Sequence, residues 1–178
     1  DVTTEIKAKL IAAREPGVDR EKIQSELDEL KNQLVSISES SGFNGENWLQ
    51  NDGATAAVDK SIVGSFKRSS GGEVSVTTVD VVVSNLTLIG TDNETLGILT
   101  KDIDADALLD TPTGTAANYR LIDMTGETTS ATGTVISVGA GTTDAQLDQM
   151  IQVTDEIIEQ ITSAAADLGS TGQDRKSV

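Results

Sequence analysis

Apolar residues recur at helical spacing near the start of the chain. They predict a helix over residues 2–15, because residues three and four apart lie on the same helix face. Pro16 and Gly17 follow directly, and this pair is typical of a helix end. The apolar face of this helix comprises Val2, Ile6, Leu10 and Ala13.

A second helix is predicted over residues 19–38. Its apolar positions step by four and three, which is the heptad spacing of a coiled-coil seam. Asp19 can cap the first turn, and Val18 is placed to pack against that turn. The seam residues are Ile23, Leu27, Leu30, Leu34 and Ile37.

A third helix is predicted from Thr143 to about Leu168. Thr143 and Gln146 fit a capping box at its start. Two adjacent apolar stripes widen its buried face, so we expect it to contact both of the first two helices. The chain would then run out along two helical rods and return along a third, antiparallel one. The predicted packing residues of this helix are Leu147, Ile151, Ile158, Ile161 and Leu168.

Between the helices the apolar period changes to that of strands. Residues 62–67 and 74–79 flank the Ser- and Gly-rich residues 69–72, which predicts a β-hairpin. Residues 86–140 are rich in Thr, Gly and Asp with short apolar runs, and indicate either a small, mostly β insertion or irregular structure with weak strands. A short helix is predicted over 104–109. The fold class is therefore α+β.

The composition excludes several function classes. The chain has no Cys and no His, which removes disulfides, thiolate chemistry, His-based catalysis and the HExxH zinc motif. Its 29 acidic and 13 basic residues give a net charge of −16, which argues against nucleic acid or an anionic membrane as partner. Aromatic residues are too few to line a deep ligand pocket. We expect no cofactor, no metal and no enzymatic activity.

Two acidic clusters are candidate metal sites. Asp102, Asp104 and Asp106 have the spacing that opens an EF-hand loop, but Ala107 stands where that loop needs Gly, and Thr113 where it needs Glu. The sequence instead predicts a solvated acidic turn or a helix start. The cluster of Asp92, Asn93 and Glu94 is interpreted in the same way.

Three segments carry a resemblance to a known family. Residues 12–19 read Ala-Ala-Arg-Glu-Pro-Gly-Val-Asp, and after the second predicted helix comes a Phe-Asn-Gly segment. In this order they resemble the amino-terminal half of bacterial flagellins, most closely those of the rhizobial type. Residues 161–170 resemble the returning helix of that family. The family motif segment is Phe43, Asn44, Gly45, Asn47, Trp48 and Leu49.

The resemblance implies a function and a domain organisation. Residues 1–85 and 142–178 would form the helical outer-core domain with its β-hairpin, and residues 86–141 a variable outer domain. The protein would be an extracellular structural subunit of the flagellar filament, which serves swimming motility. Its partners would be other flagellin subunits and the export apparatus, chaperone and cap protein. The terminal helices that drive polymerisation in the family have no counterpart in this chain, so we expect it to be monomeric.

The sequence leaves two alternatives open and argues against a third. A hook–filament junction protein would share the rods, although the Phe-Asn-Gly segment favours a flagellin. A surface adhesin could bind carbohydrate through the insertion, although Tyr119 is its only aromatic residue. A protease in the variable region would need a zinc motif, which a chain without His cannot form.

Overall fold

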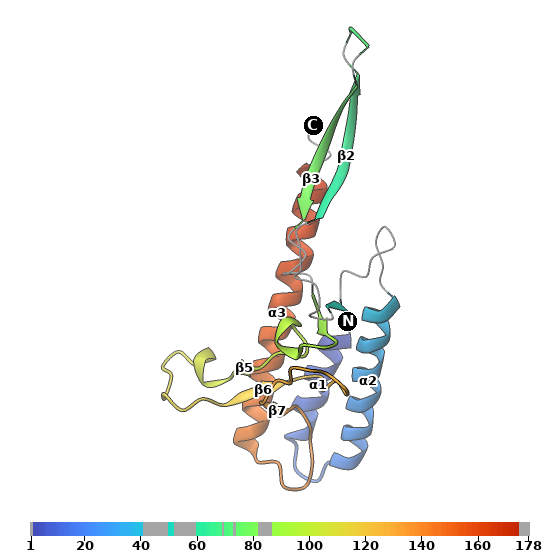
Figure 1. Cartoon of the computed structure of the whole chain (residues 1–178). Coiled ribbons are helices and arrows are strands. Elements are labelled where there is room, and N and C mark those ends of the chain that lie inside the picture. The colour runs from blue at the N-terminus through green and yellow to red at the C-terminus, as the bar shows by residue number, and fades with distance from the viewer. Residues whose placement is uncertain are drawn as a thin grey trace.

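The computed structural model describes residues 2–40, 50–51, 60–68, 70–72, 74–81 and 87–174. Its three α-helices are α1 (Val2–Ala13), α2 (Arg20–Ser40) and α3 (Asp144–Asp174), and a long hairpin stands beside the far part of α3 (Figure 1). The hairpin strands are β2 (Lys60–Arg68) and β3 (Val74–Val81). The mixed α+β class predicted from the sequence is confirmed.

The helix starts follow the predicted caps. The Asp19 carboxylate accepts a hydrogen bond from the Lys22 backbone N–H at 3.1 Å. Thr143 and Gln146 bond reciprocally, with the Gln146 N–H donating to Thr143 Oγ1 at 3.1 Å and the Thr143 N–H to Gln146 Oε1 at 3.0 Å. Each cap satisfies N–H groups that have no partner within the first helical turn. The capping box at α3 is therefore confirmed.

Helix α1 lies between α2 and α3 and packs against both (Figure 1). It runs antiparallel to α3, because Lys7 pairs with Asp155 at 2.5 Å whereas Arg14, directly after the end of α1, pairs with Asp148, which lies earlier in α3. We expected α3 to pack on both of the other helices. It packs most extensively on α1, and next on β3 and on the segment before it. Helix α2 meets α3 through an ion pair between Arg20 and Asp144 at 3.9 Å, and both helices contribute to one core.

The β2–β3 hairpin is antiparallel, as predicted. Its register pairs Lys60 with Val81 at one end and Arg68 with Val74 at the other, with a bulge between Val63 and Ser65. Gly72 in the turn has a φ of +88°, a left-handed conformation that favours glycine.

Residues 87–141 contain only very short elements. A two-residue parallel pairing joins β1 (Gln50–Asn51) to β4 (Ile89–Gly90). A three-stranded sheet has the order β5–β6–β7, antiparallel and then parallel. Of the two interpretations, irregular structure with weak strands is the one observed. The elements are β4, η2 (Glu94–Leu96), β5 (Ile103–Asp104), η3 (Asp106–Leu108), β6 (Asn118–Arg120) and β7 (Thr134–Val135).

One hydrophobic core joins this segment to the helices. Leu99, Leu121 and Ile136 of the segment are fully buried, and they belong to the same cluster as Leu10 of α1 and Ile157 of α3. The proposed division into an outer-core domain and an outer domain over residues 86–141 stays a prediction. Any boundary between them would cut through this shared core.

The predicted packing residues differ in burial. Ile6, Leu10, Ile23, Leu27, Leu30, Leu34 and Leu147 are buried in the core, Ile151 and Ile161 pack against it, and Ile158 is half-buried. Ile37 is instead 47% exposed and Ser38 is buried beside it, so the heptad does not continue into the last turn of α2. The side chain of Leu168 and the motif residues Phe43, Asn44, Gly45, Asn47, Trp48 and Leu49 lie outside the described part of the chain.

Candidate functional site

Carboxylates hold the irregular segment together by accepting bonds from backbone N–H groups. Asp106 accepts bonds from the N–H groups of Thr113 and Gly114, each at 2.9 Å, and from the Thr113 hydroxyl at 2.6 Å. The Thr113 hydroxyl and the backbone bonds hold the pKa of Asp106 below its ordinary value. Asp106 is only 7% exposed, so the expectation of a solvated turn is wrong for this residue, whereas the alternative expectation of a helix start is confirmed, because η3 begins at Asp106.

The other two aspartates of the EF-hand-like spacing bind backbone in different places. Asp104 accepts N–H bonds from Asp106 at 3.0 Å and from Ala117 at 2.8 Å. Asp102 accepts the N–H of Gly133 at 2.8 Å, and a Cβ at Gly133 would lie 2.3 Å from an Asp102 oxygen. The three side chains therefore close three separate loops, and do not converge on one ion.

Glu94 is the centre of the largest polar network in the segment. It is fully buried, and its carboxylate accepts a bond from Arg120 at 2.5 Å. It also accepts the backbone N–H of Met124 at 2.8 Å and that of Ala131 at 2.7 Å. A buried carboxylate is tolerated only with a paired charge and filled hydrogen bonds, and this one has both. The expectation of a solvated turn is wrong for Glu94, whereas the alternative expectation of a helix start is confirmed, because η2 begins at Glu94 with Asn93 as its cap.

Arg120 connects this carboxylate to two further chain segments. Its Nε donates to the Gly133 carbonyl at 3.0 Å, and an Nη group donates to Asp123 at 2.9 Å. One guanidinium thus ties η2, β6 and the approach to β7 together. A single arginine beside Tyr119 in a strongly acidic segment was the available sequence signal for this pair.

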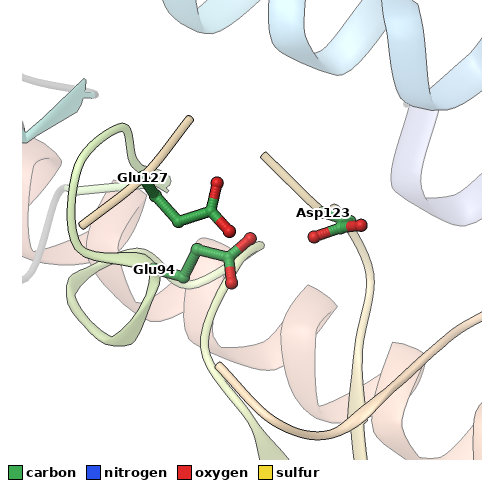
Figure 2. A group of neighbouring side chains, drawn as sticks. All are labelled: Glu94, Asp123 and Glu127. Carbon is green, nitrogen blue, oxygen red and sulfur yellow. The ribbon is translucent and has the colours of Figure 1, made fainter. Parts of the chain in front are cut away.

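Three carboxylates lie near one another, those of Glu94, Asp123 and Glu127 (Figure 2). One oxygen of each lies within 4.8 Å of an oxygen of each of the other two. Glu127 lies near Glu94, and its Oε1 accepts the Ser130 hydroxyl at 2.7 Å, while its Oε2 is buried without a hydrogen-bond partner. The Ser130 bond is the main cause that lowers the pKa of Glu127. Arg120 bonds two of the three carboxylates, those of Glu94 and Asp123. Its guanidinium therefore supplies the positive charge that a bound metal ion would otherwise bring.

One face of α2 binds the backbone that leads into α3. Lys31 donates to the Ile136 carbonyl, Gln24 accepts the Val138 N–H at 2.6 Å, and Arg20 donates to the Thr142 carbonyl at 2.6 Å. Burial lowers the pKa of Lys31 to about 8, against the opposing effect of Asp28 and Asp123. This contact fixes the connection between β7 and α3 against α2.

The described part of the surface carries a shallow groove and a few exposed apolar side chains. A shallow groove on α2 is lined by Glu29, Asn32, Gln33, Ser36 and Ile37, most of which are polar. Ile11 of α1 is 49% exposed, and Leu96, Leu108 and Leu109 are also exposed. Among the described helices, none has the length and apolar character needed to cross a membrane.

Comparison with known proteins gives a consistent family. Residues 1–54 match the model of the bacterial flagellin N-terminal helical region. The chain is 51% identical to Flagellin C of Rhizobium meliloti (strain 1021) over 96% of its own length and 52% of that protein. Flagellin B and Flagellin A of the same strain are 40% and 37% identical, each over 98% of this chain and 44% of the relative. The chain thus spans about half the length of these relatives. It belongs to the bacterial flagellin family, and the members it resembles here are rhizobial.

Proposed function

We propose that this chain is the outer part of a structural subunit of the bacterial flagellar filament, with no enzymatic role. The observation that carries the proposal is the similarity to three flagellins along almost the whole chain. The three-helix scaffold of the described residues supports it. The filament would be extracellular and would serve as the propeller for swimming.

Helices α1, α2 and α3 would supply the rod of the subunit, over residues 1–85 and 142–178. Repeated contacts between unlike faces of identical subunits build an open filament when the rotation does not close. Exposed apolar residues on such a rod, Ile11 above all, would lie at these contacts. Residues 86–141 would face outward while remaining anchored to the rod through the shared core.

The further partners are proposed from family resemblance. They are the flagellar export apparatus, an export chaperone and the filament cap protein. Export through a narrow channel requires an unfolded chain, and a chain without Cys forms no disulfide that would resist unfolding. Neither nucleic acid nor an anionic membrane suits a surface with a net charge of −16.

Assembly of the full-length protein that carries this sequence tests the proposal. We expect purified monomers to grow into filaments on short filament seeds, as seen by electron microscopy, whereas the 178-residue chain alone sediments as a monomer. Failure of the seeded full-length protein to elongate would contradict the proposal.

A matched pair of variants tests the contact surface separately. Ile11 and Thr4 are both exposed and lie seven residues apart on α1, so they share a face. Ile11→Asn in the full-length protein should slow elongation at least several-fold, and Thr4→Asn should leave it near the wild-type rate. An elongation rate of Ile11→Asn that equals the wild-type rate would exclude Ile11 from the subunit contact. It would not affect the filament assignment.

A further inference from the structure

We draw no further inference here: the strongest candidate, the carboxylate cluster of Glu94, Asp123 and Glu127 between η2 and the loop after β6 (Figure 2), already holds the guanidinium of Arg120, and the carboxylate oxygen of this cluster that lacks a partner, Oε2 of Glu127, belongs to a side chain that is only half-buried.

Discussion

In residues 87–141, individual carboxylates accept the backbone N–H bonds that helices and strands satisfy elsewhere in the chain. The strands there are two or three residues long, so they satisfy few backbone groups. Asp102, Asp104, Asp106 and Glu94 each accept two backbone N–H bonds across loops. Buried backbone donors need such partners wherever no ladder supplies them. The Asp-rich composition of the segment is therefore structural.

Removing the Glu94 carboxylate should destabilise the fold strongly. Glu94→Ala would leave Arg120 and two backbone N–H groups without their buried partner, and breaking a buried pair costs about 3–5 kcal/mol. Urea unfolding followed by circular dichroism would measure the loss. The control is Asp123→Ala, which removes an exposed partner of the same arginine and should cost at most about 1 kcal/mol. Similar losses for both variants would refute the central role of Glu94.

Lys31 should make stability depend on pH in the alkaline range. Its pKa is lowered from 10.5 to about 8 in the folded chain, so folding disfavours the charged form. The resulting penalty is complete below about pH 8 and disappears as the pH rises toward 10.5. The shift corresponds to about 3 kcal/mol, so the folded wild type should gain up to about that much stability over this interval.

The measurement compares the wild type with Lys31→Met at pH 7 and pH 10. The wild type should gain about 2–3 kcal/mol in its free energy of unfolding, relative to Lys31→Met, between pH 7 and pH 10. Lys22→Met, at an exposed position of the same helix, is the control. Parallel pH profiles for the wild type and Lys31→Met would show that Lys31 is not buried as described.

At the scale of elements, the sequence predicted what depends on local patterns. The three helices, the α3 capping box and the hairpin follow from apolar period, cap residues and a Gly-rich turn, all of which act within a few residues. The polar contacts could not be predicted in this way. Glu94 and Arg120 are 26 residues apart, and Lys31 and Ile136 are 105 apart, and no local pattern specifies such pairs.

The end of the α2 seam shows where a correct pattern was extended too far. The heptad step from Leu34 leads to Ile37, but the structure buries Ser38, whose hydroxyl bonds the Val35 carbonyl at 2.8 Å. A sequence repeat predicts which residues share a helix face. It does not predict how far along that face the neighbouring residues pack.

Two alanine substitutions on α2 test this seam. Leu27 is fully buried, so Leu27→Ala should destabilise the chain by about 2–5 kcal/mol. Ile37→Ala removes a side chain that is 47% exposed and should cost less than about 1 kcal/mol. Thermal or urea unfolding of both variants gives the comparison. A loss at Ile37 as large as that at Leu27 would mean that the seam extends through the last turn.

At the scale of the whole molecule, the shared core predicts a single unfolding transition. Leu121 lies fully buried in the segment, and its cluster includes residues of all three helices. Leu121→Ala should therefore cost about 2–5 kcal/mol and should reduce hydrogen-exchange protection in α1 and α3 as well as around the mutation. Leu108→Ala, at an exposed position of the same segment, should change little. If Leu121→Ala loosens only residues 87–141, the segment is an independent outer domain.

The location of the protein on the cell tests the central claim most directly. Antibodies raised against this 178-residue chain, with gold label, would be viewed by electron microscopy on cells that make the full-length protein. The filament assignment predicts gold along the whole length of the flagellar filaments. A single band where the hook meets the filament would indicate a junction protein, and label over the cell surface with bare filaments would indicate an adhesin. Either of these results would contradict the account.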